Sequence, residues 1–240
     1  HARVSLPGGC AIGARPINLH IQGLEKLGAR VHTEHGYVDA RAEGLVGSEL
    51  LFEKITVTGT ENLMMAATLA TRRTVLQNAA CEPEVVDLAE MLIKMGAKIS
   101  GAGTSTITIE GVRELKGTAH RIIPDRIEAG TFLVAAAITD GAIELVDSNP
   151  GHLSSVIDTL RQTGANIKTG PDRLTVRGSG ELNAADILTM EYPGFPTDMQ
   201  AQFMALLTPA TEEMIPGPWA ASAPAARRVR RSRTAAKSSN

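Results

Sequence analysis

The chain has 240 residues, 43% of them hydrophobic, and is therefore long enough for one large or two small globular domains. No stretch reaches the roughly 18 apolar residues that a membrane span needs, and no basic and apolar leader opens the chain, so a soluble, cytoplasmic protein is expected. Two cysteines, Cys10 and Cys81, give no disulfide framework.

The formal net charge is −2, but no acidic residue follows residue 214 while several basic residues do. This basic arm lacks interleaved aromatic residues, so it argues only weakly for nucleic-acid binding.

Residues 5–16 concentrate glycine and proline and are predicted to form a loop. Two of its glycines have the spacing of a phosphate-binding loop, but Ala14 and Arg15 stand where that motif needs lysine and serine or threonine, so a nucleoside triphosphatase is excluded. Cys10 lies in the same loop near Arg15, whose positive charge would favour the thiolate and a role as nucleophile or proton donor. A surface thiol without function is the alternative. Cys81 is expected only to pack.

A unit of 68 residues is repeated along the chain. Three apolar-periodic segments end at Gly28, Gly96 and Gly164, which lie 68 residues apart, and a glycine in the left-handed conformation is a common helix terminator. Each predicted helix is followed by two short β-branched runs with a glycine-containing turn between them. The predicted hairpins cover residues 29–40, 98–110 and 166–176.

A second helix recurs in each unit at nearly the same offset. The three predicted helices cover residues 64–70, 133–139 and 202–208. Two of them contain alanine-rich runs, which suit helices that are buried on most faces. A repeat that holds two helices and several strands is too large for a solenoid. The predicted fold class is therefore α/β, with helices packed inside sheets.

Polar residues open each of these second helices. The three segments are Thr58-Gly59-Thr60-Glu61, Asp125-Arg126-Ile127-Glu128 and Pro196-Thr197-Asp198. Unpaired N–H groups and the helix dipole favour anions at such entrances, so the three could converge on a phosphorylated ligand. Asp198 could act as a base toward a sugar hydroxyl, or it could be an ordinary N-cap. Arg126 is expected to form an ion pair with Asp125 or Glu128, and Lys54 could meet a phosphate or be solvated.

Metal and dinucleotide sites are not predicted. The six histidines lack the spacing of a zinc-binding motif. Gly101 and Gly103 lack the third glycine and the helix of a dinucleotide fingerprint, and they are expected to form a turn instead. We therefore expect neither a metal ion nor a cofactor.

Three longer segments are specific enough to indicate a family. They cover residues 4–10 with 12–16, residues 124–128 with 130–137, and residues 195–203. They resemble the enolpyruvyl transferase family, and within it the UDP-N-acetylglucosamine 1-carboxyvinyltransferases. The resemblance is collinear from residue 1 to about residue 208. It implies an inside-out α/β barrel built from repeated units, which accords with the 68-residue repeat. The Pro-Gly-Gly-Cys sequence argues against the related enzyme that acts on shikimate 3-phosphate.

The resemblance also implies an activity and the residues that carry it. Family members transfer the enolpyruvyl group of phosphoenolpyruvate to the 3′-hydroxyl of UDP-N-acetylglucosamine, the first committed step of the peptidoglycan synthesis on which cell shape and cell division depend. Cys10 matches the loop cysteine that donates a proton, can form an adduct with phosphoenolpyruvate, and is the target of fosfomycin. Asp198 matches the proposed base for the sugar hydroxyl. The stretches that match the UDP-binding segments are Arg15, Pro16, Ile17, Asn18 and Leu19, and Lys54, Ile55, Thr56 and Val57.

The same resemblance implies three parts in the chain. Residues 1–121 would be the C-terminal part of the first domain, residues 122–208 would begin the second, and residues 209–240 would form a basic tail outside the family pattern, expected to be disordered. The family's N-terminal Lys-Asn motif and its C-terminal arginines have no counterpart, so the chain is expected to be truncated at both ends. The alternative to a transferase is a non-catalytic fragment that retains part of the UDP-sugar site. The oligomeric state stays open.

Overall fold

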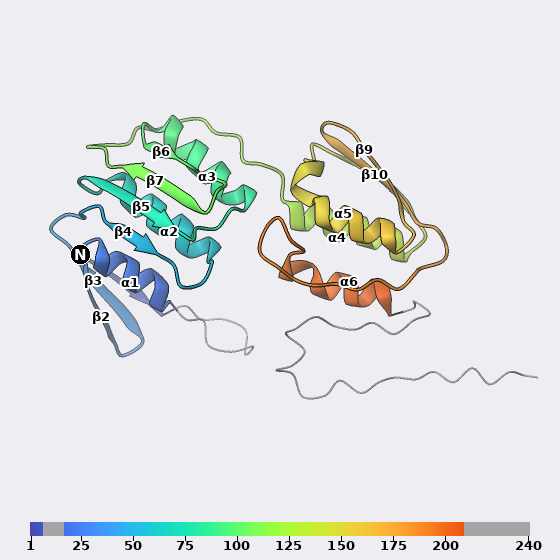
Figure 1. Cartoon of the computed structure of the whole chain (residues 1–240), viewed down its shortest axis with the longest axis horizontal. Helices are drawn as coiled ribbons and strands as arrows, with labels where there is room; N and C mark the ends of the chain where they lie inside the picture. Colours follow the sequence, from blue (N-terminus) through green and yellow to red (C-terminus); the bar gives the residue numbers. More distant parts are fainter. Residues whose placement is uncertain (7–16, 209–240) are drawn as a thin grey trace, which may run out of the picture.

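The computed structural model describes residues 1–6 and 17–208, and the predicted catalytic Cys10 lies outside these residues. The described residues form two lobes joined by residues 117–125 (Figure 1). The first lobe comprises β1 (Ala2–Ser5), α1 (Asn18–Lys26), β2 (Arg30–Glu34), β3 (Tyr37–Arg41), β4 (Glu49–Leu51), α2 (Val57–Thr68), β5 (Arg73–Gln77), α3 (Pro83–Lys94), β6 (Lys98–Ser100) and β7 (Thr106–Glu110). The second lobe comprises α4 (Arg126–Ile138), β8 (Ala142–Val146), η1 (Pro150–Leu153), α5 (Ser154–Gln162), β9 (Asn166–Thr169), β10 (Arg173–Arg177), η2 (Thr197–Met199) and α6 (Gln200–Leu207).

The three predicted helix ends are confirmed. Gly28, Gly96 and Gly164 have φ angles of 96°, 107° and 100°, which residues with a Cβ rarely adopt. The backbone N–H of Gly28 donates to a carbonyl of α1, and the following N–H, of Ala29, donates to a second carbonyl one residue earlier. The same two bonds recur after α3 and α5. They satisfy carbonyl groups that a helix end otherwise leaves unpaired, so all three units leave their helix in the same way.

The three predicted hairpins are also confirmed. β2 pairs with β3, β6 with β7, and β9 with β10, in each case antiparallel. The strands form three sheets with the orders β1-β3-β2, β4-β5-β7-β6 and β8-β10-β9. Gly101 and Gly103 both have φ of 82° in the turn between β6 and β7, as their predicted turn requires.

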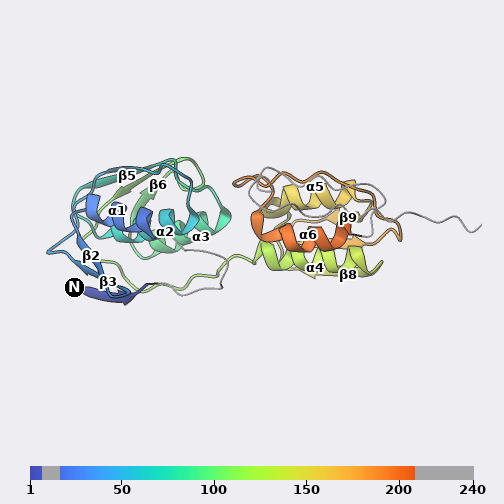
Figure 2. The same ribbon diagram turned by 90° about the horizontal axis from the view of Figure 1, so that it is seen from below.

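Each lobe has its own hydrophobic core around one central helix. In the first lobe, α2 packs against α1, α3, β5 and β7, and Leu63 and Met64 are at most 1% exposed. In the second lobe, α4 packs against α5, α6, β8 and β10, and Leu133 is fully buried. Figure 2 shows these helices lying against the strands of their lobes. Helices packed inside sheets are therefore confirmed, and the two separate cores support a domain boundary near residue 121, which stays a prediction.

The helices of the first lobe begin at the same end of the lobe. The N–H of Ala80, which precedes α3, donates to Thr60 Oγ1 in the first turn of α2 at 3.1 Å. At the opposite end, residues 112–116 donate backbone hydrogen bonds to Thr68 of α2 and to Met95, the C-cap of α3. Because the starts are joined and the ends are joined, α2 and α3 run parallel. Their N-termini therefore face the same side.

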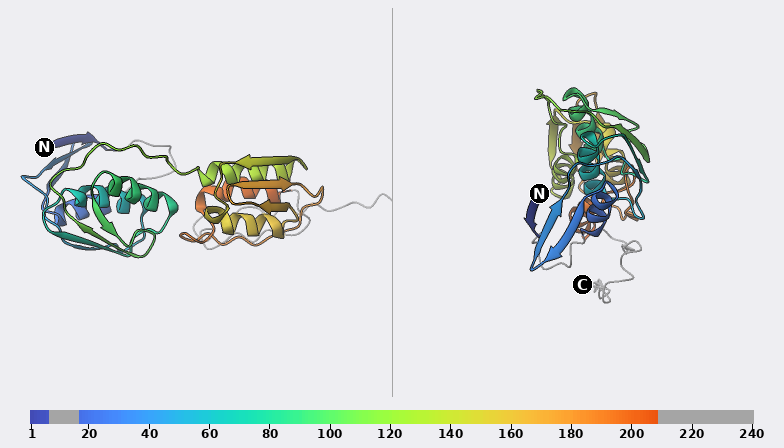
Figure 3. Two further views of the ribbon diagram at one scale, coloured as in Figure 1. Left: turned by 90° about the horizontal axis from the view of Figure 1, so that it is seen from above. Right: turned by 90° about the vertical axis from the view of Figure 1, so that its left-hand side faces the viewer.

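The second lobe repeats this arrangement. Gln202, near the start of α6, donates to Thr131 Oγ1 in the second turn of α4 at 3.0 Å. Met199, directly before α6, lies so close to Gly130 that a Cβ there would come within 3.0 Å of its sulfur. The helices α4 and α6 thus begin at the same end, and Figure 3 shows the start of α4 close to the linker that leads to the first lobe.

Candidate functional site

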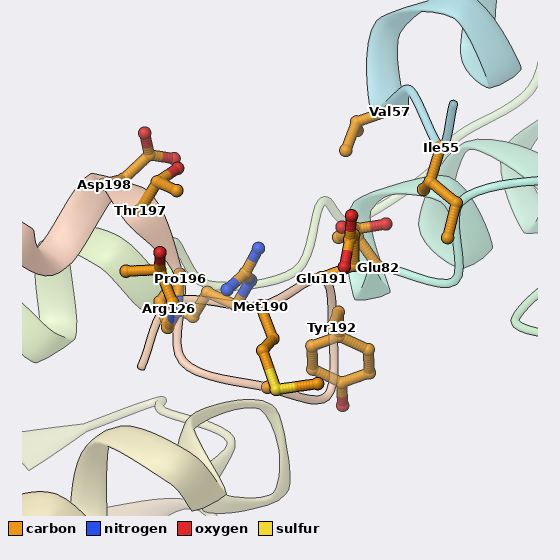
Figure 4. A pocket seen from close by; sticks show the side chains of 12 residues that line it. Ile55, Val57, Glu82, Arg126, Met190, Glu191, Tyr192, Pro196, Thr197 and Asp198 are labelled. Carbon is orange, nitrogen blue, oxygen red and sulfur yellow. The ribbon is translucent and has the colours of Figure 1, made fainter. Parts of the chain in front are cut away.

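A pocket of about 260 Å³ lies between the two lobes. The first lobe contributes Ile55, Val57 and Glu82, while the second contributes Arg126 and residues of the segment 189–198. Figure 4 shows Ile55 and Val57 on one side and Asp198 on the other, with Arg126 between them. A small-molecule site at a boundary between domains is a common arrangement.

The entrances of several helices meet at this pocket. Val57 is the first residue of α2, Arg126 is the first residue of α4, and Glu82 is the N-cap of α3. Asp198 belongs to η2, the turn directly before α6. Of the three predicted entrance segments, Arg126 and the whole of Pro196-Thr197-Asp198 line the pocket, whereas Thr58-Gly59-Thr60-Glu61 does not and only the preceding Val57 does. Convergence on a phosphorylated ligand stays a prediction, which the partial positive charge of helix N-termini supports.

Side chains hold two of these entrances in place. Thr56 Oγ1 accepts from the N–H of Gly59 at 3.1 Å, so α2 begins at Val57, one residue ahead of the predicted entrance. Asp125 Oδ1 accepts from the N–H groups of the second and third residues of α4 at 2.8 and 3.0 Å. These caps satisfy some of the free helix N–H groups and leave others for a ligand.

Asp198 is exposed on the wall of the pocket and forms no side-chain hydrogen bond or ion pair with any other described residue. The alternative of an ordinary N-cap is wrong, because the N-cap of α6 is Met199 and no side chain caps that helix. Buried neighbours fix the turn instead: Met199 is 0% exposed, and Phe195 packs edge-on against Phe203 with ring centroids 4.9 Å apart. The carboxylate oxygens of Asp198 are thus free to accept a hydrogen bond from a ligand hydroxyl.

Arg126 is paired differently from the prediction. Its Nε donates to Glu84 Oε1 of α3 at 2.9 Å, and its guanidinium lies 5.6 Å from the ring centroid of Tyr192. Neither predicted partner, Asp125 or Glu128, forms an ion pair with Arg126; Asp125 Oδ1 instead accepts from backbone N–H groups of α4. Glu84 belongs to the first lobe, so no local sequence pattern could indicate this ion pair.

Carboxylates gather on the first-lobe side of the pocket. Glu82 is 6% exposed, and its Oε2 is buried without a hydrogen-bond partner among the described residues. Burial raises the pKa of the Glu61 carboxyl above its usual value, and the negative charges of Glu84 and Glu82 raise it further. This side of the pocket therefore favours a cation or a hydrogen-bond donor, in contrast to the helix entrances beside it.

The predicted site residues are only partly brought together. Ile55, Val57 and Asp198 line the pocket, whereas Lys54 and Thr56 belong to the same segment but do not. Ile17 precedes α1, while Asn18 and Leu19 begin it, and none of the three lines the pocket. Cys10, Arg15 and Pro16 lie outside the described residues.

Several lining residues were not predicted. They are Glu82, Thr189, Met190, Glu191, Tyr192 and Gly194. Glu82 sits directly before Pro83, and a proline in the first turn marks a helix start, so this entrance could have been found by the same reasoning as the others. The segment before Phe195 has no helical or strand period, and nothing in it indicates which residues face the pocket.

A second pocket, of about 450 Å³, lies at the opposite end of α4. It is lined by Asp140 and Glu181 and by the last residues of the helix, where the dipole is negative. Both features disfavour an anionic ligand, so this pocket is the weaker candidate despite its larger volume.

Across residues 1–6 and 17–208, no group of three side chains is arranged to hold a metal ion, and no helix is long and apolar enough to cross a membrane.

His152 lies in η1 near the ion pair of Glu84 and Arg126. Burial lowers the pKa of its imidazole, an effect that the charge of Glu84 opposes, and its Nδ1 is buried without a partner. Because the unfolded chain then binds more protons below about pH 6.5, stability falls as the pH drops from 7 toward 5. We expect His152→Gln to reduce this loss. The free energy of unfolding, measured with urea at pH 7, 6 and 5, gives the size of this loss. His35→Gln, at an exposed histidine, is the control and is expected to lose as much stability as the parent. An equal loss in the parent and in His152→Gln would contradict the prediction.

Comparison with known proteins agrees with the fold. The family model described as EPSP synthase (3-phosphoshikimate 1-carboxyvinyltransferase) matches residues 1–214. The enolpyruvyl transferase NikO from Streptomyces tendae superimposes with a TM-score of 0.74 at 23% identity, over 87% of this chain and 51% of that one. EPSP synthase from Acinetobacter baumannii superimposes with a TM-score of 0.54 at 22% identity, over 78% of this chain and 45% of that one. At these identities the structures support the fold alone, and they confirm an incomplete enolpyruvyl transferase fold.

Comparison of sequences gives relatives of higher identity. A UDP-N-acetylglucosamine 1-carboxyvinyltransferase of Koribacter versatilis is 60% identical over 207 residues, which are 86% of this chain and 48% of the relative. One of Acidobacterium capsulatum is 62% identical over 210 residues, 87% of this chain and 48% of the relative. The chain thus spans about half the length of the curated relatives it matches. Since the family model matches most of its residues, the chain belongs to the EPSP synthase (3-phosphoshikimate 1-carboxyvinyltransferase) family.

Proposed function

We propose that this chain carries part of a site that transfers the enolpyruvyl group of phosphoenolpyruvate to the 3′-hydroxyl of UDP-N-acetylglucosamine. The observation that carries the proposal is the identity of about 60% with relatives that bear the name of this activity. The acceptor is the sugar nucleotide and not shikimate 3-phosphate, although the family model takes its description from the latter, because the relatives of high identity are UDP-N-acetylglucosamine enzymes.

The chemistry assigns one role to each of two residues. Asp198 accepts the proton of the 3′-hydroxyl while that oxygen attacks the substituted carbon of the enol, and Cys10 donates a proton to the methylene carbon. Loss of phosphate, with return of a proton from the new methyl group, then restores the double bond in the product. The exposed Asp198 carboxylate, unpaired among the described residues and next to the helix entrances, supports the role of base.

The nucleotide-binding residues stay predictions. Arg15, Pro16, Ile17, Asn18 and Leu19 with Lys54, Ile55, Thr56 and Val57 would bind the UDP moiety. The hydrogen bond of 2.8 Å between His20 of α1 and Asn62 of α2 supports this assignment, because it keeps the start of α1 close to α2. The division near residue 121, the cytoplasmic location and the absence of nucleic-acid and membrane partners are likewise predictions.

The second candidate is a fragment that binds the UDP-sugar without turnover. One observation supports it: the described lining contains three carboxylates, Glu82, Glu191 and Asp198, and one cation, Arg126. Phosphoenolpyruvate and a diphosphate are both anionic, so a competent site needs more positive charge than these residues supply.

Phosphate release separates the two candidates. The transferase predicts release of phosphate from phosphoenolpyruvate that depends on added UDP-N-acetylglucosamine. Calorimetric binding of UDP-N-acetylglucosamine without phosphate release would establish the fragment. Neither binding nor release would contradict both candidates.

A further inference from the structure

We propose that the ion pair between Glu84 and Arg126 sets the distance between the two lobes and makes Arg126 a positioning residue for the pocket. Glu84 belongs to the first turn of α3 and Arg126 is the first residue of α4, so the pair joins the helix entrances of different lobes. Its Nε to Oε1 distance is 2.9 Å.

The pair is the single polar contact between the lobes in the part of the chain that the structure describes. No other hydrogen bond or ion pair there joins a residue of 1–116 to a residue of 126–208. The linker is anchored differently: His120 bonds to Asp87 of the first lobe, and Arg121 pairs with Asp147 of the second. Without Glu84 and Arg126, the linker with its two ion pairs would be the remaining polar connection between the described lobes.

The surroundings of the pair strengthen it. The Arg126 side chain is only 11% exposed, and its guanidinium also packs against Tyr192. Exposed ion pairs contribute little because water screens them, whereas the loss of one partner leaves a buried charge unpaired. Glu84 and Glu82 both lie close enough to Glu61 for their charges to raise the pKa of its carboxyl, so Arg126 also balances a local excess of negative charge.

The position of the pair connects it to the pocket. Arg126 lines the pocket between the α2 entrance and the η2 turn that carries Asp198, whereas Glu84 does not line it. A change in the distance between α3 and α4 would therefore move Val57 and Asp198 relative to each other. Replacement of Glu84 tests positioning without removing a group from the pocket wall.

The test is a distance measurement on the whole chain without ligand. Spin labels are placed at Glu90→Cys of α3 and Asp158→Cys of α5, both exposed, after Cys10 and Cys81 are replaced by serine. Pulsed electron–electron double resonance on the parent is expected to give one narrow distribution of distances between the two spin labels. Glu84→Ala and Arg126→Ala are each expected to broaden it and shift it to longer distances, while circular dichroism remains that of the folded parent.

Two further variants make the test specific. The exchange of charges in the double variant Glu84→Arg with Arg126→Glu is expected to restore much of the narrow distribution. Arg121→Ala, which breaks an ion pair whose partners are 84% and 72% exposed, is the matched control and is expected to leave the distribution unchanged. A parent-like distribution in both single alanine variants would overturn the proposal, and so would equal broadening in the control.

The consequence for binding rests on the proposed function and is measured separately. Glu84→Ala is expected to weaken UDP-N-acetylglucosamine binding several-fold, whereas the control Arg121→Ala is expected to bind the sugar nucleotide as the parent does. If the distances change as described while the parent binds no UDP-N-acetylglucosamine, the proposed function fails and the positioning role stands. If the parent binds the sugar nucleotide and Glu84→Ala binds it equally well, the positioning role in the pocket fails.

Discussion

Replacement of Asp198 by asparagine is expected to lower UDP-N-acetylglucosamine-dependent phosphate release by about 10²- to 10⁴-fold, the usual contribution of a general base. Asparagine keeps the size of the side chain and its hydrogen-bonding capacity but cannot accept the hydroxyl proton. Because Asp198 makes no bond to other described residues, the substitution should leave stability nearly unchanged. Initial rates of phosphate release and the affinity for the sugar nucleotide are the quantities to measure.

The pattern of the two quantities decides the role of Asp198. A large loss of rate with little change in affinity is expected for a base. A loss of affinity alone would show that Asp198 only binds the hydroxyl. Glu191→Gln is the control, since Glu191 is also an exposed carboxylate that lines the pocket, and the proposed chemistry gives it no proton to accept.

Replacement of Phe203 by alanine is expected to destabilise the second lobe by about 3–5 kcal/mol, as for other buried aromatic residues. Phe203 is 0% exposed, belongs to the core around α4, and packs edge-on against Phe195. The substitution would remove the contact between Phe195 and Phe203, which lie on either side of the η2 turn in the sequence. Asp198, which belongs to that turn, would then lose its fixed position. The effect on folding and the effect on the pocket therefore have one cause.

Native-state hydrogen exchange measures this loss lobe by lobe. Backbone amides of α6 and β10 should exchange faster, while those of α2 and β7 in the first lobe should keep their protection. Phe132→Ala is the matched control, because Phe132 is 52% exposed on α4 and its removal should change stability by about 0.5 kcal/mol or less. Uniformly faster exchange in both lobes would contradict the independence of the two cores.

The repeated part of the fold could be predicted from the sequence because its signals are local. Gly28, Gly96 and Gly164 each end a helix in a conformation that other residues avoid, and the runs after them alternate in a way that requires paired strands. The recurrence of a second helix in each copy of the unit could also be predicted, since α2, α4 and α6 follow one another at similar spacings along the chain.

The remainder of the site depends on contacts between residues far apart in the chain. Arg126 has acidic neighbours on both sides in sequence, Asp125 and Glu128, but its partner is Glu84 of the other lobe, and Asp125 accepts from backbone N–H groups of α4 instead. Asp198 has the sequence of an N-cap, but the η2 turn moves the start of α6 to Gln200. Tyr192 and its neighbours reach the pocket through packing that no local period reveals.

The central proposal is that a UDP-sugar binds in the pocket that Asp198 lines and that this binding changes the reactivity of the Cys10 thiol. Alkylation of Cys10, followed by mass spectrometry with and without saturating UDP-N-acetylglucosamine, tests it most directly. Cys81 provides an internal reference, since burial and the charge of Glu82 raise its pKa and slow its reaction. The account predicts that the sugar nucleotide changes the labelling rate of Cys10 and leaves that of Cys81 unchanged. A labelling rate of Cys10 that is the same with and without the ligand would contradict it.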